Sequence, residues 1–411
     1  MNSTEGQGML PTTKKRLACA VAEPVRARSV KQKQLHDSPF TWTGQFRPEL
    51  ARAHVDAHTT AGAHVWDPFV GSGTVLLACV ARKAGIVAHG TDVNPAAIAM
   101  SRVASCATWK SARLAAAMAA MTKAVKRCKS AVDATESQNL LIGQRPTMND
   151  DVRLLADALL CRTERPSGGA RMTVGDAWPP FRTFVETLPK SKALVEARMC
   201  DARASGLPDA SVDLVLTSPP YINVINYHQQ YRGLMERLGW RVLMAAPSEI
   251  GANRKHRSNR LLTIVQYCLD MSAVLDEMAR VCKPGARAIL VVGRESQVAG
   301  ASIPNSRIVE RLAIEAGKWR RAGPTEERSF VNRFGRRIVE DVLHLAPDPS
   351  TTAVAPLTIA LDVLNAIDPC VVGKALLTKA IAAAPSVPSS PMLNCAVVAG
   401  CSSDELVKLP Q

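Results

Sequence analysis

The chain has 411 residues, enough for one large domain or two modest ones, with an apolar content ordinary for a globular protein. Its formal net charge of +15 favours a polyanionic partner, either nucleic acid or an anionic membrane surface, although a merely soluble basic protein would have the same composition. No apolar run approaches the ~20 residues that span a bilayer, and residues 17–22 are too short for a secretory signal, so we expect a cytoplasmic protein without membrane association.

Residues 1–35 carry many lysines and arginines and few large apolar residues, so we expect a flexible basic arm. It could contact phosphates loosely, or it could be a disordered leader without such a role. Residues 36–109 then form the first part of a folded domain. Phe46 and Pro48 lie where a helix begins, with Pro48 near its first turn.

The cysteines and histidines give no metal-binding pattern. Eleven cysteines are scattered without a Cys-x-x-Cys pair, which predicts reduced, mostly buried thiols rather than a disulfide framework or a zinc site. His54 and His58 are spaced for one helix face, but no cysteine or acidic residue completes a ligand set. We therefore expect no metal and interpret both histidines as solvated helix residues.

Residues 67–74, Asp-Pro-Phe-Val-Gly-Ser-Gly-Thr, form what we call the glycine turn, between a predicted strand at 63–66 and a predicted helix that begins near residue 75. Gly71 and Gly73 let the backbone turn tightly and approach a ligand, and the free N–H groups of the helix start would point at that ligand. Many tight turns that bind nothing have the same composition.

A second predicted strand, residues 86–91, follows at the spacing of a Rossmann-like unit. It ends in Asp92, where a carboxylate could hold a ribose diol. Asn94 then caps a helix that begins with Pro95.

Residues 110–192 break the alternation of strands and helices, and we interpret them as a helical insertion. An alanine-rich helical stretch with several lysines and arginines gives way to a polar region that contains proline and glycine. The insertion could be a target-recognition region with a basic face, or simply a helical cover over one face of the sheet.

Residues 193–345 form the second part of the domain, in which the sheet resumes. Predicted strands at 193–197 and 211–216 lead toward Asp201 and toward Thr-Ser-Pro-Pro-Tyr at residues 217–221. In open parallel sheets the carboxyl ends of the strands form the edge where ligands bind, so we expect the polar strand ends to converge on one crevice. These strand-end residues are Asp67, Asp92, Asp201 and Ser218.

Polar, aromatic and basic residues follow this motif, and a cationic loop occurs near residue 255. Base stacking and phosphate pairing use such side chains, although a solvated surface loop would have the same composition. The candidate nucleic-acid contacts are Asn226, Tyr227, Arg232, Arg254, Lys255, Arg257 and Arg260.

The remaining elements continue the α/β pattern. We predict an amphipathic helix over 261–282, a buried strand at 288–293, a helix over 303–317, and a hairpin over 328–345. Past residue 346 the composition shifts to Ala, Pro, Ser and Thr, which indicates a weakly ordered tail, residues 346–411, with one short helix near 357–367.

Residues 218–221, which we call the tetrapeptide, have the groups needed to activate an amino group. An exocyclic amino group of a nucleobase is a poor nucleophile because its lone pair is delocalised into the ring. The Ser218 hydroxyl and the Pro219 carbonyl could accept its two N–H bonds and draw the nitrogen toward tetrahedral geometry. Pro219 and Pro220 would fix the backbone, and Tyr221 would stack on a flipped base. Alternatively, the prolines merely end a strand and Tyr221 fills the core.

The glycine turn followed by Thr-Ser-Pro-Pro-Tyr resembles the DNA amino-methyltransferases of the class I S-adenosylmethionine-dependent fold, over about residues 46–345. Serine before the proline pair is more similar to the cytosine-N4 branch than to the adenine-N6 branch. The resemblance implies an α/β, Rossmann-like fold with a mostly parallel sheet, helices on both faces, a helical insertion and disordered termini. It also implies S-adenosyl-L-methionine as the cofactor and double-stranded DNA as the partner. It is compatible with a cognate restriction endonuclease that acts on the same DNA site.

The family's functional residues carry over by motif. Residues 46–50 match the segment that closes over the methionine end of the cofactor, Asp92 would take the ribose hydroxyls, and Asp201 would lie by the adenine amino group. The implied cofactor-binding residues are Phe46, Pro48, Asp67, Pro68, Phe69, Gly71, Ser72, Gly73, Thr74, Asp92, Asn94 and Asp201. The implied catalytic residues are Ser218, Pro219, Pro220 and Tyr221.

Two features depart from the family pattern. The stretch between Asp92 and Asp201 is longer than the single helix and strand often found there. In addition, the tetrapeptide comes after the glycine turn, whereas many cytosine-N4 enzymes have it before the glycine motif. The expected activity is methyl transfer to the exocyclic amino group of a flipped base, with cytosine N4 as the first choice. Adenine N6, guanine N2 of an RNA, and a DNA-binding relative without catalysis are the alternatives.

Overall fold

The computed structural model describes residues 38–45, 47–164, 170–222, 224–252, 256–331, 335, 337–350 and 354–400. The basic arm expected at residues 1–35 lies outside the described residues. Three of the candidate site residues also lie outside them. They are Phe46, Arg254 and Lys255.

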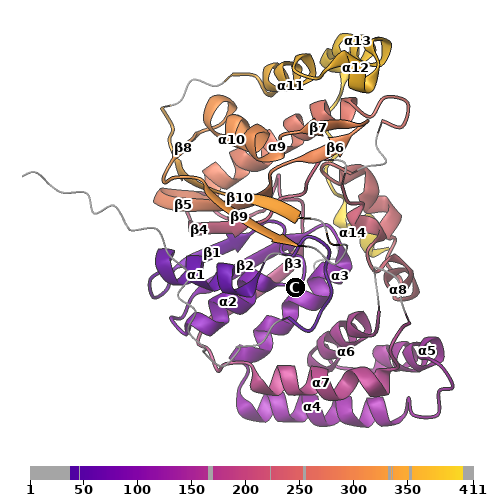
Figure 1. The fold of residues 1–411 in the computed structure, drawn as a ribbon. Coiled ribbons are helices and arrows are strands. Elements are labelled where there is room, and N and C mark those ends of the chain that lie inside the picture. Colours follow the sequence, from indigo (N-terminus) through magenta and orange to yellow (C-terminus); the bar gives the residue numbers. More distant parts are fainter. Residues whose placement is uncertain are drawn as a thin grey trace, which may run out of the picture. The chain divides into compact units, whose positions relative to one another are not determined.

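An eight-stranded, mostly parallel sheet forms the centre of the fold (Figure 1). Its strands are β1 (His64–Asp67), β2 (Val87–Asp92), β3 (Leu194–Met199), β4 (Val212–Thr217), β5 (Cys282–Gly293), β8 (Trp319–Arg321), β9 (Glu326–Val331) and β10 (Arg337–Pro347). Their order is β3-β2-β1-β4-β5-β10-β8, and β9 pairs with β10. Strands β1 to β5 are parallel to their neighbours, whereas β10 is antiparallel to β5, β8 and β9. A separate small hairpin pairs β6 (Ser296–Val298) with β7 (Ala301–Ile303).

The strand order reverses beside β1. Strands β2 and β3 lie on one side of β1, and β4 and β5 lie on the other. In open α/β sheets, ligands bind outside the carboxyl ends of the strands at such a reversal. Asp67 ends β1 and Thr217 ends β4, so the glycine turn and the tetrapeptide both start at this point.

Side chains along the central strands alternate between two hydrophobic cores, as the two-residue period of a strand requires. On β1, Val65 packs into one core and Trp66 into the other, and Leu214 and Val215 on β4 alternate in the same way. The first core is covered by α1 (Pro48–His58) and α2 (Thr74–Arg82), and the second by α9 (Leu262–Val281), α10 (Asn305–Arg311) and α11 (Pro356–Asn365). The prediction of an α/β sheet with helices on both faces is confirmed.

Local signals account for where several elements begin. Pro48 is the first residue of α1, where its missing N–H does not interrupt a helical hydrogen bond. Asn94 caps α3 (Pro95–Ser101) through a hydrogen bond that its Oδ1 accepts from Ala96 N at 2.8 Å. Gly335, with a φ of +74°, lies between β9 and β10 as the predicted hairpin requires.

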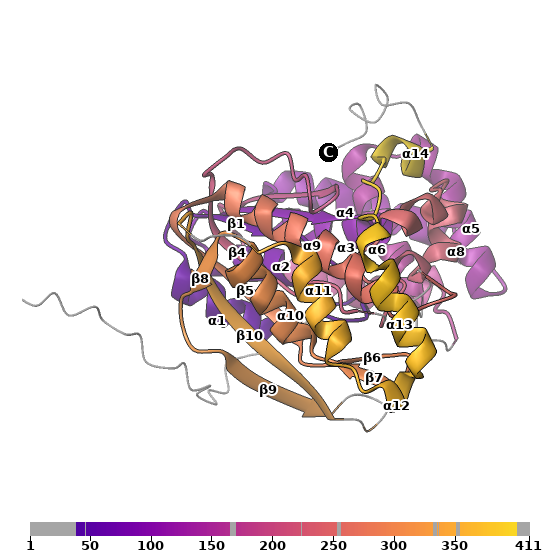
Figure 2. The same ribbon diagram turned by 90° about the horizontal axis from the view of Figure 1, so that it is seen from above.

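The insertion forms a helical layer of its own, as predicted (Figures 1 and 2). Its helices are α4 (Ser111–Lys126), α5 (Ala134–Gln144), α6 (Asp150–Thr163) and α7 (Val174–Thr187). They share one core, in which Leu155, Leu159 and Phe181 are fully buried. Lys123 and Lys126, in the last turn of α4, are exposed, whereas most of the other exposed residues of this helix are alanines.

The C-terminal residues are more ordered than the sequence indicates. We expected a weakly ordered tail with one short helix, but residues 354–400 form α11, α12 (Pro369–Val372), α13 (Lys374–Ala383) and α14 (Cys395–Ala399). Leu364, Leu377 and Ala380 enter the same core as α9. The composition was misleading because alanine and leucine on one helix face are enough to pack onto a neighbouring helix.

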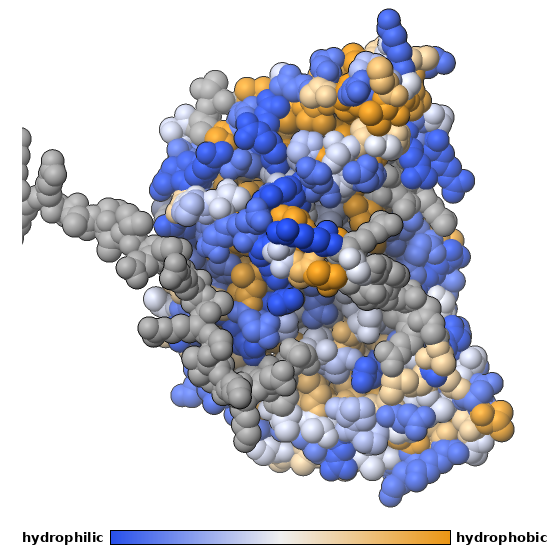
Figure 3. Space-filling view, in the orientation of Figure 1, coloured by the Kyte–Doolittle hydropathy of each residue, from blue (hydrophilic) through white to orange (hydrophobic). Residues whose placement is uncertain are grey.

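None of the described helices is both long and apolar enough to cross a bilayer. Polar and charged residues occupy most of the face seen in Figure 3, and apolar groups gather at the top of the view over the C-terminal helices. Val371 of α12 is an exposed apolar residue of this region.

Candidate active site

A buried hydrogen bond joins the glycine turn to the strand that carries the tetrapeptide. Thr217 Oγ1 donates to Asp67 Oδ1 at 2.6 Å across 150 positions of sequence, and Phe69 N donates to the same oxygen at 3.1 Å. Asp67 and Thr217 are buried at the carboxyl ends of adjacent parallel strands. The prediction that the two motifs lie at one edge of the sheet is confirmed.

A pocket at this edge contains residues from both motifs. Of the predicted site residues, those lining it are Pro68, Phe69, Asp92, Asp201, Ser218, Pro220 and Tyr227. Asp67 lies behind the wall, where it is 2% exposed. Three of the four strand-end residues expected to converge therefore line one pocket, and the fourth supports it from behind.

The glycine turn leaves no room for Cβ atoms. A Cβ at Gly71 would lie 2.7 Å from Trp42 Nε1, and one at Gly73, whose φ is +87°, would lie 2.8 Å from the Cα of Ser101. The space beside the two glycines is therefore filled by Trp42 and Ser101, and residues 71–74 lie outside the lining of the pocket. The Ser72 hydroxyl is buried without a hydrogen-bond partner among the described residues. A buried hydroxyl without a partner is unfavourable unless a ligand or water satisfies it.

Gly73→Ala is expected to lower the free energy of unfolding by about 2–4 kcal/mol, because a left-handed residue with a Cβ is strained and this Cβ also meets backbone. Gly62→Ala is the matched control, since Gly62 has a φ of +76° with nothing near its Cβ position. Its expected loss is about 1 kcal/mol. Urea unfolding of both variants measures the difference, and equal losses would show that the contact with Ser101 is unimportant.

Asp92 ties the end of β2 to the glycine turn. Its carboxylate accepts hydrogen bonds from Gly71 N at 3.1 Å and from Asn94 N at 2.9 Å. Burial raises the pKa of Asp92 to about 6, although these backbone donors oppose the shift. Asn94 in turn donates to Tyr227 O at 2.8 Å, so the loop after the tetrapeptide is held against the end of β2.

The tetrapeptide is held by residues that the sequence did not single out. Pro220 O accepts a hydrogen bond from Tyr267 Oη at 3.0 Å, and Tyr221 Oη donates to Glu340 Oε1 at 3.2 Å. The ring of Tyr221 packs on Gly293, where a Cβ would lie 2.9 Å from Cε2. Burial raises the pKa of Tyr221, so its phenol is neutral. Tyr221 and Pro219 lie beside the pocket rather than among its lining residues.

The segment before α1 lies over the glycine turn. Gln45 Nε2 donates to Thr74 Oγ1 at 2.9 Å, and Trp42 stacks on Tyr231 with ring centroids 6.2 Å apart. The segment that the family resemblance implies for the methionine end of the cofactor is the next one, residues 46–50, of which Phe46 lies outside the described residues. Pro48 follows as the first residue of α1 and lies outside the pocket lining.

Glu249 lines the pocket and was not predicted. It is 2% exposed, and its carboxylate accepts hydrogen bonds from the backbone N–H of His228 and, at 2.7 Å to Oε2, from Nδ1 of the same histidine. Glu249 directly follows the short helix η4 (Val242–Ser248) and belongs to no motif. A tertiary contact with His228 holds it at the site, and the sequence offered no signal for that contact.

The candidate nucleic-acid residues are dispersed. Tyr227 lines the pocket, Arg257 and Arg260 are exposed, and Arg232 pairs with Glu236 within α8 (Arg232–Arg237) at 2.7 Å. The other described candidate is the half-buried Asn226. Of these described candidates, Tyr227 alone lines the pocket, and the exposed arginines lie in a different part of the chain.

His54 corrects the expectation that the α1 histidines are solvated. It is buried, and its ring centroid lies 5.5 Å from that of His344 on β10 and 6.1 Å from that of His58. Burial lowers the pKa of His54 to about 4, and the neighbouring histidines act in the same direction. Within the described ranges, no three histidine, cysteine or acidic side chains are arranged to hold a metal ion.

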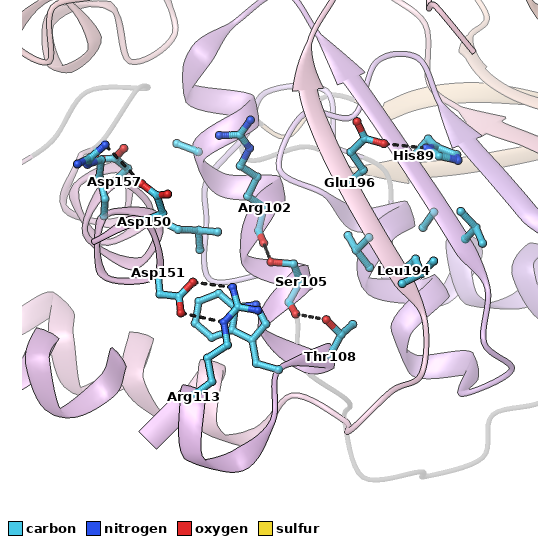
Figure 4. A pocket seen from close by; sticks show the side chains of 17 residues that line it. His89, Arg102, Ser105, Thr108, Arg113, Asp150, Asp151, Asp157, Leu194 and Glu196 are labelled. Atoms are coloured by element: carbon cyan, nitrogen blue, oxygen red, sulfur yellow. Dashed lines mark hydrogen bonds and ion pairs between the residues drawn. The ribbon is translucent and has the colours of Figure 1, made fainter. Parts of the chain in front are cut away.

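A second hollow lies between η1 (Arg102–Thr108), α6 and the edge strand β3, at the junction of the insertion and the sheet (Figure 4). It is lined by acidic as well as basic side chains, and these pair with one another, as Arg113 does with Asp151 at 2.6 Å. Such mutual pairing leaves little attraction for a phosphate chain. The insertion therefore does not present a basic cleft on this side.

No family model and no curated protein matches the sequence. Solved structures that resemble the chain include TrmN from Thermus thermophilus, with 14% identity, a TM-score of 0.33, and coverage of 74% of this chain and 50% of that one. The chain thus matches half the length of TrmN. A SAM-dependent methyltransferase from Methanosarcina mazei has 13% identity, a TM-score of 0.31 and coverage of 72% and 96%. The rRNA methyltransferase aviRa from Streptomyces viridochromogenes has 14% identity and a TM-score of 0.29, and the match covers 75% of this chain and 88% of that one. Likenesses of this size carry no argument about activity.

Proposed function

We propose that the chain transfers a methyl group from S-adenosyl-L-methionine to the exocyclic amino group of a DNA base, with cytosine N4 as the acceptor. The observation that carries the proposal is the hydrogen bond from Thr217 to Asp67 at 2.6 Å. Either motif alone is compatible with an ordinary tight turn or a strand end. Together on one pocket, they combine a loop suited to a cofactor with a motif suited to activating an amino group.

The residues of the pocket fit a cofactor that is cationic and carries a ribose. S-adenosylmethionine supplies an activated methyl group on a positively charged sulfur. The carboxyl groups of Asp67, Asp92 and Glu249, on and behind the pocket wall, would provide compensating negative charge when ionised. The Ser72 hydroxyl in the glycine turn has no hydrogen-bond partner among the described residues, and a bound ligand would supply one.

The tetrapeptide would act by orienting the base and localising a lone pair. The Ser218 hydroxyl and the Pro219 carbonyl would accept hydrogen bonds from the two N–H groups of the amino group. The nitrogen lone pair would then be directed at the methyl carbon, in line with the carbon–sulfur bond. The nitrogen–carbon bond forms as the carbon–sulfur bond breaks, and the nitrogen releases one proton to solvent. Tyr267 fixes the proline pair through its hydrogen bond to Pro220 O, so the acceptors are in place before the base arrives.

The choice of a DNA base rests on charge and on the first residue of the tetrapeptide. The net charge of +15 and the exposed Arg257 and Arg260 suit a phosphate backbone. Tyr227 offers an aromatic face inside the pocket to a base that has left the duplex. Serine at position 218, rather than aspartate, supports cytosine N4 over adenine N6.

Expression in a host without DNA methylation, followed by direct long-read sequencing, tests the proposal. We expect N4-methylcytosine at one recurrent short sequence, and none from cells that express Ser218→Ala. N6-methyladenine would move the proposal to adenine, and methyl groups found only on RNA would overturn the DNA assignment. Unmodified nucleic acid, with DNA binding retained, would favour the binding protein without catalysis.

A further inference from the structure

Residues 388–398, which we call the strap, follow α13 and lead into α14 (Figure 2). They contact Met199, the last residue of β3. The strap is fixed by hydrogen bonds at both of its ends and at its centre. They are Gln266 Nε2 to Pro388 O at 3.1 Å, Ser390 N to Asp270 Oδ1 at 2.7 Å, Cys395 Sγ to Met199 O at 3.3 Å, and Arg241 N to Val398 O at 2.8 Å. This segment of the C-terminal region is therefore built into the edge of the sheet where the pocket opens.

Arg203 connects the strap to the pocket. Its guanidinium binds Asp201 in a bidentate pair at 2.9 and 2.7 Å, and it also contacts Asp270 at 3.1 Å. Two of its nitrogens donate to strap carbonyls, Ser390 O at 2.7 Å and Pro391 O at 2.9 Å. The side chains of Arg203, Asp201 and Asp270 are 3%, 6% and 0% exposed. Bidentate pairs with little solvent access fix geometry strongly, so the strap and the end of β3 form one rigid unit.

The Asp201 carboxylate is fully engaged by this network. Oδ1 accepts from the backbone N and the Nε of Arg203 at 3.0 and 2.9 Å, and Oδ2 accepts from Arg203 Nη2 at 2.7 Å and from Leu393 N at 3.0 Å. A carboxylate has about four acceptor sites. A hydrogen bond from an adenine amino group would have to displace one of these four donors.

We propose that Asp201, Arg203 and Asp270 are positioning residues that anchor the strap, and that the anchored strap holds the purine end of the pocket, at Cys200, Asp201 and Ala202, in shape for the cofactor. The inference rests on the proposed use of S-adenosylmethionine. It differs from the family resemblance, in which Asp201 itself would read the adenine amino group. The two assignments of Asp201 predict different selectivities between adenine and other purines. As an anchor of the strap, Asp201 would support the binding of any purine, whereas in direct contact with the ligand it would distinguish purines by their amino group.

The experiment uses full-length protein and compares binding of S-adenosylhomocysteine with that of S-inosylhomocysteine, in which an oxygen replaces the amino group, by calorimetry. The Ser390 hydroxyl donates to Asp270 Oδ2, so Asp270→Asn and Ser390→Ala both change the anchor, and neither residue lines the pocket. Asp276→Asn is the matched control, an exposed carboxylate on the same helix as Asp270. Hydrogen exchange of the strap amides, particularly Ser390 and Leu393, reports whether the anchor is released.

We expect Asp270→Asn and Ser390→Ala to weaken both ligands by about tenfold, with faster exchange in the strap and an unchanged ratio between the ligands. Asp201→Asn is expected to behave in the same way. Selective loss of the preference for the amino ligand in Asp201→Asn would overturn the inference, as would wild-type affinity in the two anchor variants. If Asp270→Asn fails to fold, the milder Ser390→Ala decides. Wild-type protein that binds neither ligand would overturn the proposed function itself, which is a distinct result.

Discussion

Ser218→Ala is expected to slow methyl transfer by about 10²–10³-fold while leaving the affinities for DNA and cofactor nearly unchanged. The side chain is half-buried in the pocket wall, and removing one oxygen leaves the surrounding fold intact. In the proposed reaction the hydroxyl accepts an N–H bond of the target amino group. That bond strengthens as the nitrogen becomes tetrahedral, so its loss raises the barrier more than it weakens ground-state binding.

Single-turnover methylation with labelled cofactor measures the chemical step, and fluorescence anisotropy measures DNA binding. Ser211→Ala is the matched control, because Ser211 directly precedes the same strand, β4, and lies outside the pocket. Tyr221→Phe separates the ring from its hydroxyl, which donates to Glu340. A wild-type rate in Ser218→Ala would mean that the tetrapeptide merely ends β4, and the catalytic assignment would be lost.

The elements that the sequence predicted are those fixed by local chemistry. The glycine turn, the proline at the start of α1 and the cap at Asn94 depend on backbone preferences of a few adjacent residues. The alternation of Val65 and Trp66 between two cores follows from the two-residue period of a strand. From such signals we could predict the parallel sheet and the meeting of the glycine turn with the tetrapeptide at one edge, but not the hydrogen bond between Asp67 and Thr217.

The features that the sequence did not predict depend on contacts between distant segments. Glu249 reaches the pocket because His228 holds it, and the strap is ordered because Arg203 and Asp270 bind its backbone. His54 is buried because α1 packs so that its ring meets His344. No periodicity or short motif records these pairings, since each partner looks like an ordinary polar residue in its own neighbourhood.

Asp67→Asn is expected to raise the free energy of unfolding at pH 8 by about 2–4 kcal/mol, and by less at pH 5. Burial raises the pKa of Asp67 from 3.8 to about 7, so the fold disfavours its ionised form. Between pH 3.8 and about 7 the folded chain holds a proton that the unfolded chain has released, and stability therefore falls as pH rises through this window. Above the window the full penalty remains, at about 1.4 kcal/mol for each pKa unit.

Asparagine can keep both hydrogen bonds of Asp67, because Thr217 and Phe69 both donate to Oδ1 and an amide oxygen is also an acceptor. Thr217→Val is a control for which we expect the opposite change in the free energy of unfolding. It removes a donor from a buried carboxylate, and we expect it to destabilise the fold by about 1–3 kcal/mol. Urea unfolding at pH 5 and pH 8 measures both variants, and an equal gain for Asp67→Asn at the two pH values would contradict the raised pKa.

The titration of Asp67 could also serve cofactor binding, which would offset the stability that the ionised carboxyl costs the fold. If the pocket takes a cationic cofactor, binding favours the ionised carboxyl, so the affinity of the wild-type protein for S-adenosylmethionine should increase as pH rises through about 7. Asp67→Asn cannot ionise and should lose that pH dependence while gaining stability. Calorimetry at pH 6 and pH 8 distinguishes this from a purely structural role, in which the affinities of variant and wild type would respond to pH in the same way.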